Sequence, residues 1–159
     1  MLINRTIAIR VIGCGVLIIL LSACGLKTSN TSSRYITWDG LEPDKWAAVW
    51  LIKRHIDTNA DIVLRPIGAP TDSGIAFGVP GAKYKRSHGV SVYESLRQGF
   101  QKDDLALQEL SRIIRDIEIS PWARKTSAHS ATVEQAFRRL QDHFKARIVP
   151  VDCYGRFFD

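Results

Sequence analysis

The sequence predicts a single small domain of the α+β or α/β class, with about four helices around a small sheet, preceded by a signal peptide. The length of 159 residues fits one domain, because domains usually contain about 100–200 residues. Short apolar stretches typical of strands are interspersed with segments whose apolar residues recur at helical spacing. With 45% hydrophobic and 24% charged residues, the composition is that of an ordinary globular protein.

Residues 1–23 have the features of an export signal. Arg5 and Arg10 give a positive start, and Val11 to Leu21 is an apolar run of eleven residues. A membrane-spanning helix needs about 20 apolar residues, so a cleaved signal peptide fits this run better than an uncleaved N-terminal anchor.

A lipid anchor is expected directly after this leader. The segment Leu21-Ser22-Ala23-Cys24-Gly25 resembles the lipobox of bacterial lipoproteins, in which the cysteine thiol receives a lipid as a thioether. We therefore predict cleavage before Cys24 and attachment of the mature chain to a membrane through that residue. Gly25 in place of aspartate favours the outer membrane, facing the periplasm, if the cell is Gram-negative.

The first half of the mature chain contains a tether, two strands and a helix. Residues 24–34 are mostly small and polar and predict a flexible tether, so the domain is expected over residues 35–159. Tyr35–Trp38 predicts the first strand. Pro43 at a first helical position starts a helix to about Ile56, and Asp61–Arg65 is a second strand candidate.

The middle of the chain contains a strand candidate, a loop and two helices. Ile75–Val79 is a short apolar run that predicts a strand, and Lys83–Gly89 is a basic loop. Ser91 and Glu94 have the spacing of a capping box and predict a short helix to about Gly99. Apolar residues at helical spacing predict a further helix over about 103–117.

The last part predicts one helix and one strand. Apolar residues between Val133 and Phe144 recur at helical spacing, with Glu134 and Arg138 paired four residues apart. The closing run 148–152 is expected to form a strand that continues into Cys153, which we interpret as a small buried hydrophobic residue. Since Cys14 leaves with the leader and Cys24 carries the lipid, the mature domain cannot form an internal disulfide.

Charge and motifs exclude several functions. The chain has 22 basic and 16 acidic residues, and removal of Arg5 and Arg10 with the leader leaves 20 against 16, a net charge of +4. This mild excess lacks the clustered basic stripe of a nucleic-acid-binding protein. The mature chain contains no dinucleotide-binding glycine motif, phosphate loop or nucleophile elbow. We therefore expect no cofactor, and an enzyme is the less favoured class.

Two groups of cations are candidates for binding an anion. Lys53 and Arg54 follow Trp50 at helical spacing on a helix that is apolar all round. Cations on a buried helix need an anionic partner, which a ligand or Asp57 would supply. Alternatively, they project into solvent at the helix end.

The second group lies in the basic loop before Ser91. Arg86 supplies a bidentate fork and His88 a titratable donor, next to a helix N-terminus whose N–H groups favour anions. A solvated surface loop is the alternative. A metal site formed by His88, Glu94 and Asp116 is a further, weaker alternative, because their spacing matches no known ligand pattern.

Several short motifs resemble one family. They are Tyr35–Trp38, Asp44–Ala47, Trp50–Arg54, Ile56-Asp57, Phe77–Gly81, Arg86–His88 and Ile113–Glu118. Together they resemble the chromate resistance exported protein family, over about Tyr35 to Glu118 with a weaker continuation to Phe158. The resemblance implies a role in chromate tolerance and reduced chromate accumulation. Some members of that family carry a separate N-terminal part and act as regulators, whereas this chain has a lipoprotein leader in that place.

These observations lead to one leading hypothesis. A lipid-anchored protein would contribute to chromate resistance by binding chromate or a related oxyanion at a basic pocket beside a tryptophan; its predicted residues are Lys45, Trp50, Lys53, Arg54, Arg86 and His88. The alternatives are a metal-dependent envelope enzyme and a structural envelope lipoprotein. The sequence identifies no protein partner.

Overall fold

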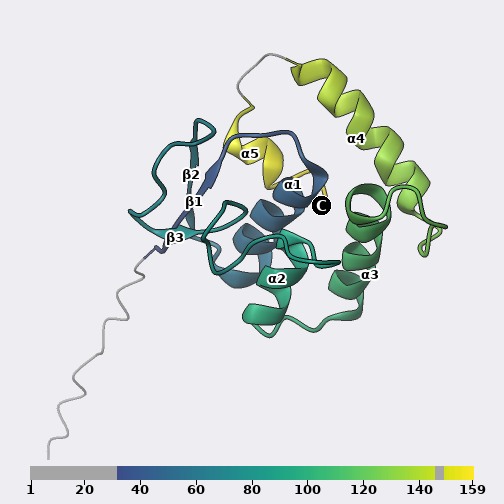
Figure 1. Cartoon of the computed structure of the whole chain (residues 1–159), viewed down its shortest axis with the longest axis horizontal. Helices are drawn as coiled ribbons and strands as arrows, with labels where there is room; N and C mark the ends of the chain where they lie inside the picture. Colours follow the sequence, from purple (N-terminus) through teal and green to yellow (C-terminus); the bar gives the residue numbers. More distant parts are fainter. Residues whose placement is uncertain (1–31, 146–148) are drawn as a thin grey trace, which may run out of the picture.

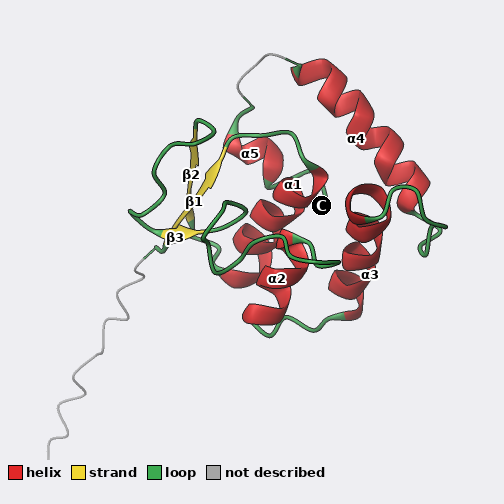
Figure 2. Ribbon diagram, viewed as in Figure 1, coloured by secondary structure: helices red, strands yellow, loops and turns green. Residues whose placement is uncertain are grey.

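The computed structural model describes residues 32–145 and 149–159, and Figures 1 and 2 show how its helices and strands are arranged. The predicted leader, Cys24 and most of the tether lie outside these residues. Along the chain the elements are β1 (Arg34–Trp38), α1 (Pro43–Leu51), the π-helical turn η1 (Ile52–Ile56), β2 (Asp61–Arg65), β3 (Ile75–Ala76), α2 (Val92–Gly99), α3 (Leu105–Ile114), the π-helical turn η2 (Arg115–Ile119), α4 (Ser130–Phe144) and α5 (Val151–Tyr154).

The three strands form one parallel sheet in the order β2-β1-β3. Ile36 in the central strand β1 lies opposite Val63 of β2 and Ala76 of β3. Parallel neighbours need a crossover connection, and helix α1 with η1 provides it between β1 and β2. The strands at 35–38 and 61–65 are therefore confirmed.

Helix α1 is the centre of the domain. Pro43 begins it, as predicted, and Trp46 to Val49 together with Leu51 and Ile52 are fully buried. Figure 1 shows α1 between the sheet and α3, and it contacts α2, α3 and α5. A helix that is apolar all round belongs in a core, so the expectation that this helix is buried is confirmed.

The caps of α2 and α3 follow from local sequence. The Ser91 hydroxyl accepts a hydrogen bond from the Glu94 N–H at 3.0 Å, and Asp104 accepts one from the Ala106 N–H at 2.7 Å. These contacts satisfy N–H groups that have no partner inside the helix. The Glu94 carboxylate, however, accepts from Arg115 and Gln98, so only one half of the predicted capping box forms.

The predicted strand at 75–79 is shorter than expected. β3 ends at Ala76, and Phe77 pairs instead with Tyr84 through an isolated bridge. Gly78 has φ = 64°, a left-handed conformation that interrupts an extended strand and that glycine adopts at little cost. The chain turns away from the sheet at this residue.

The predicted strand at the end of the chain is wrong. Residues 146–148 lie outside the described part, and Val151–Tyr154, which includes Cys153, forms the short helix α5. The contacts of Tyr154 favour this helix: its ring stacks on Trp46 with 4.2 Å between the ring centres, and its hydroxyl forms hydrogen bonds with the Asp39 side chain and the Gly40 carbonyl. Cys153 is only partly buried and lies on a helix.

The domain is therefore of the α+β class, with four longer helices and one short helix in its described part around a three-stranded sheet. This confirms the predicted fold class. Within residues 32–145 and 149–159, no helix combines the length and the apolar character needed to span a bilayer.

Candidate functional site

The predicted anion-binding residues form two groups at opposite ends of α1. Lys45 lies in the first turn of α1, beside Arg86, whereas Trp50, Lys53 and Arg54 lie at its end and in η1. Lys45 and Arg54 are nine residues apart, which corresponds to roughly 14 Å along a helix. The structure does not bring the six residues together in one pocket.

Arg86 belongs to a network that binds the protein's own carboxylates. Asp44, which is 1% exposed, accepts hydrogen bonds from the N–H groups of Val92 and Tyr93, each at 2.8 Å. Arg86 pairs with the same carboxylate at 3.3 Å and with Glu118. The N-terminus of α2 therefore does hold an anion, as its N–H groups predict, but the anion is Asp44.

The pKa directions in this network have separate causes. Burial works against the charged form of Arg86, but hydrogen bonds and charge from Glu118 and Asp44 outweigh it and raise the pKa of Arg86. Burial raises the pKa of Glu118 despite hydrogen bonds from the Asp44 N–H and Arg86. Arg86, Asp44 and Glu118 thus form a structural ion network that joins α1, α2 and η2.

A cavity of about 260 Å³ opens beside this network, and we call it the Arg86 pocket; it is lined by Glu42, Asp44, Lys45, Gly78, Arg86 and Val92. It lies at the carboxyl ends of β1 and β3, a common place for ligands in parallel sheets. The Lys45 ammonium, however, pairs with Glu42 at 3.1 Å. The donors of this pocket are largely taken up by the carboxylates on its own walls.

His88 follows Arg86 by two residues in the basic loop. It is exposed at the tip of a turn in which Ser87 pairs with Val90 and Gly89 has φ = 72°. It lines none of the cavities described here. His88 therefore lines no described cavity together with the cations expected to act with it.

The three alternative metal ligands are also separated. Glu94 pairs with Arg115 at 2.9 Å, and Asp116 accepts hydrogen bonds from Thr126, Ser127 and Ser130. Asp116 is 4% exposed, and these hydrogen bonds satisfy its buried carboxylate. Within the described ranges, no three His, Cys, Asp or Glu side chains gather closely enough to hold a metal ion.

The second group forms a different pocket against the C-terminal segment. A cavity of about 280 Å³, which we call the Arg54 pocket, is lined by Lys53, Arg54, Asp152, Gly155 and Arg156. Beside it, the Asp159 carboxylate accepts hydrogen bonds at 2.9 Å from both the Trp50 indole Nε1 and the Arg54 Nε, and a third, at 2.5 Å, from an Arg54 terminal nitrogen.

This arrangement is an anion-binding geometry. The hydrogen bonds from Arg54 and Trp50 lower the pKa of Asp159 to about 2, so the carboxylate is ionised at neutral pH. The hydrogen bond to Asp159 in turn raises the pKa of Arg54. Both side chains are more than 40% exposed, so this contact is open to solvent and to competing anions.

Lys53 has a different partner from the one considered in the sequence. Its ammonium donates to the Ala60 carbonyl at 3.2 Å, whereas Asp57 accepts from the N–H groups of Ser33 and Asn59. Lys53 therefore contributes to the Arg54 pocket a positive charge with no carboxylate partner in the described part of the chain.

Sequence reasoning missed Arg156, Asp159 and Asp44 as members of these pockets. Arg156 and Asp159 reach the end of α1 because the C-terminal segment packs on it, with Tyr154 and Phe157 on Trp46 and Phe158 on Trp50; these contacts have no local pattern. For Asp44 there was a signal: an acidic residue directly after Pro43, in the first turn of a helix expected to be buried, needs a partner.

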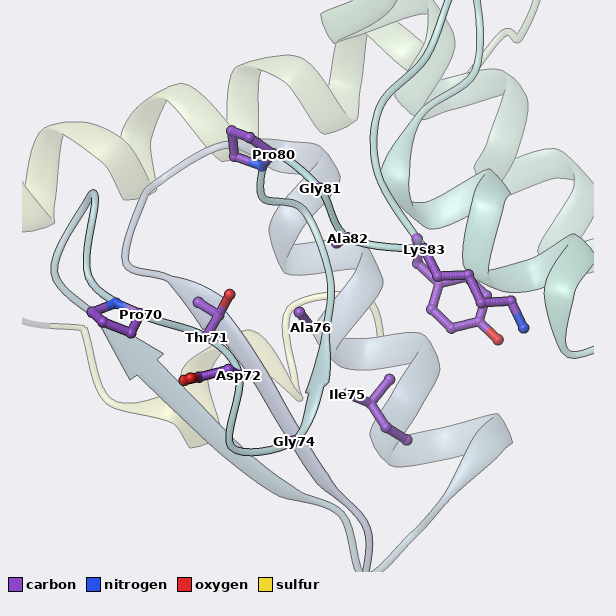
Figure 3. A pocket seen from close by; sticks show the side chains of 11 residues that line it. Pro70, Thr71, Asp72, Gly74, Ile75, Ala76, Pro80, Gly81, Ala82 and Lys83 are labelled. Atoms are coloured by element: carbon purple, nitrogen blue, oxygen red, sulfur yellow. The ribbon is translucent and has the colours of Figure 1, made fainter.

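A wider cavity of about 570 Å³ lies between the loops that flank β3. In Figure 3 its two charged side chains, Asp72 and Lys83, lie on opposite sides of the cavity. The Lys83 ammonium lies 5.0 Å from the centre of the Tyr84 ring. This cavity lacks convergent charges, and the Arg54 pocket is the better candidate for an anion.

Residues 35–159 match the family described as ChrB, C-terminal domain. The chain belongs to this family. Membership confirms the resemblance drawn from the short motifs and links the chain to chromate resistance. The Arg54 pocket and the Arg86 pocket both lie inside the matched region. No curated protein and no solved structure matches the chain.

Proposed function

We propose that this ChrB-domain protein is an exported, lipid-anchored protein that contributes to chromate resistance by binding chromate or a related oxyanion in the Arg54 pocket. The proposal has two parts, a binding site in the described domain and an anchor at Cys24. Each part has its own support and its own experiment.

The binding part of the proposal rests on the hydrogen bonds from Trp50 and Arg54 to Asp159. Three donors, from the Trp50 indole and the Arg54 guanidinium, converge on one carboxylate. A guanidinium fork binds carboxylates and tetrahedral oxyanions in the same bidentate manner. An oxyanion that displaces the exposed Asp159 side chain would receive the same donors.

The charges around the pocket favour a dianion. Lys53, Arg54 and Arg156 bring three positive charges, against the carboxylates of Asp152 and Asp159. When a ligand moves Asp159 away, three cations remain against one carboxylate. In the Arg86 pocket, by contrast, the buried carboxylate of Asp44 already occupies the donors, through hydrogen bonds from Val92 and Tyr93 and an ion pair with Arg86.

Calorimetric titration tests the binding part. The full-length chain in neutral detergent is titrated with chromate, sulfate and phosphate, up to the millimolar concentrations of a weak site. We expect heat with chromate, a strong loss of affinity in Arg54→Ala, and no change in the control Arg138→Ala, whose guanidinium pairs with Glu134 on the outer side of α4. Absence of heat with all three anions would contradict the proposal.

The anchor rests on the leader and on Cys24 at the end of an eleven-residue apolar run. Cells that express the chain are grown with radiolabelled palmitate. Wild type, Cys14→Ala and Cys153→Ala should become labelled, whereas Cys24→Ala should not. Equal labelling of Cys24→Ala would rule out this anchor without affecting the binding proposal.

A further inference from the structure

A fourth cavity, between α2 and α3, gathers three arginines that line none of the cavities above. The cavity has a volume of about 330 Å³, and its lining includes Arg97, Arg112 and Arg115. Arg97 comes from α2, Arg112 from α3 and Arg115 from η2. We call it the three-arginine pocket.

Helical spacing brings these side chains to one place. Gln108, Ser111 and Arg115 follow each other at three or four residues along α3 and η2, so they share a face with Arg112. Across the cavity, Glu94 and Arg97 lie three residues apart on α2 and also share a face. The two helices thus present their polar stripes to the same space.

One of the arginines is held rigidly. The Arg97 side chain is 12% exposed, and it donates to the Ser111 hydroxyl at 3.2 Å, to the Lys102 carbonyl at 3.1 Å and to Asp103 at 3.0 Å. A partly buried guanidinium fixed in this way loses little further conformational entropy when it binds a ligand.

Each guanidinium has one carboxylate partner, but two of those partners lie outside the cavity lining. Asp103 pairs with Arg97 and Glu109 with Arg112, and neither lines the cavity. Glu94, which pairs with Arg115 at 2.9 Å, does line it. The lining therefore carries three positive charges and one negative charge. A guanidinium has five N–H donors, so donors remain on each of the three arginines beyond these contacts.

We propose that the three-arginine pocket binds the phosphate group of a small molecule. A terminal phosphate has three strong acceptor oxygens and nearly two negative charges, which match three guanidinium forks better than a carboxylate does. The volume lies in the range of pockets for small molecules. Gln108 and Ser111 add neutral hydrogen-bonding groups for the remainder of the ligand. This proposal is independent of oxyanion binding in the Arg54 pocket.

Calorimetry with the full-length chain in neutral detergent tests it, with inorganic phosphate and pyrophosphate as probes. We expect pyrophosphate to bind, and Arg112→Ala and Arg115→Ala each to weaken it by on the order of tenfold or more. Both side chains are about half exposed, so both variants should fold, which circular dichroism checks. Arg138→Ala, whose guanidinium pairs with Glu134 on α4, serves as the control and should bind pyrophosphate as wild type does.

Three results would overturn the proposal. They are the absence of binding by either probe, binding that survives both arginine substitutions, and binding that Arg54→Ala removes. A parallel arm uses phosphatidylcholine vesicles with and without phosphatidylglycerol. Binding that needs the anionic lipid, with none to the soluble probes, would assign the phosphate to a lipid headgroup and contradict a small-molecule ligand.

Discussion

Replacement of Asp44 by alanine should destabilise the domain strongly. The buried Asp44 carboxylate accepts hydrogen bonds from the N–H groups of Val92 and Tyr93 and pairs with Arg86. In the alanine variant these N–H groups lose their acceptor at a position where the native side chain is only 1% exposed. Arg86 keeps Glu118 as a partner, so the cation is not left alone.

The contacts set the size of the effect. A buried N–H group without a partner costs about 1–3 kcal/mol, and removal of one partner of a buried ion pair costs about 3–5 kcal/mol. These terms overlap, and the loss of repulsion between Asp44 and Glu118 offsets part of them. We therefore expect Asp44→Ala to lose about 3–4 kcal/mol in the free energy of unfolding, and Asp44→Asn, which keeps one acceptor, about half of that.

Urea unfolding followed by circular dichroism measures the loss. The control is Asp142→Ala on α4, because the Asp142 side chain is 72% exposed and pairs only at the surface; it should change stability by less than about 0.5 kcal/mol. If Asp44→Ala loses less than about 1 kcal/mol, the network around Arg86 does not join the helices as described, and the reason for excluding the Arg86 pocket fails.

Three further predictions concern other parts of the chain. Asp159→Asn should bind chromate more tightly than wild type in calorimetry, because the neutral amide competes less for the donors; weaker binding would contradict the proposed displacement. Gly99→Ala should lose about 1–3 kcal/mol in urea unfolding, since its Cβ would overlap the buried Tyr84 ring, whereas Gly155→Ala, whose Cβ would lie 3.8 Å from its nearest neighbour, should lose less. Burial acts to raise the pKa of Asp116, but its hydrogen bonds outweigh burial and lower it. The free energy of unfolding of wild type should therefore exceed that of Asp116→Asn at pH 7, and this difference should decrease as pH falls below about 4. A difference that does not change with pH would refute the prediction.

Local sequence predicted the elements whose own residues determine them. Trp46 and its apolar neighbours identified a buried helix, and Ser91 identified the start of α2. Parallel pairing of β1 with both β2 and β3 depends on contacts across the chain. The short helix α5 was mistaken for a strand because a brief apolar run with Pro150 fits either structure until Tyr154 packs on Trp46.

The candidate site was predicted in part, for the same reason. Trp50, Lys53 and Arg54 come from adjacent positions of one helix, so their proximity could be predicted from spacing. No spacing or motif indicated that Arg86 lies at the other end of that helix, beside Asp44. Likewise, no pattern indicated that Asp159 pairs with Arg54, which lies 105 residues earlier in the chain.

The most direct test of oxyanion binding observes the Trp50 indole N–H, which donates to Asp159 in the absence of ligand. In a ¹⁵N-labelled chain, the indole resonance of Trp50 is assigned by comparison with Trp50→Phe and followed during titration with chromate. We predict that it shifts and saturates in wild type, and that Arg54→Ala abolishes the shift. A Trp50 resonance that stays in place while chromate binds elsewhere, or while no binding occurs, would contradict the proposed function.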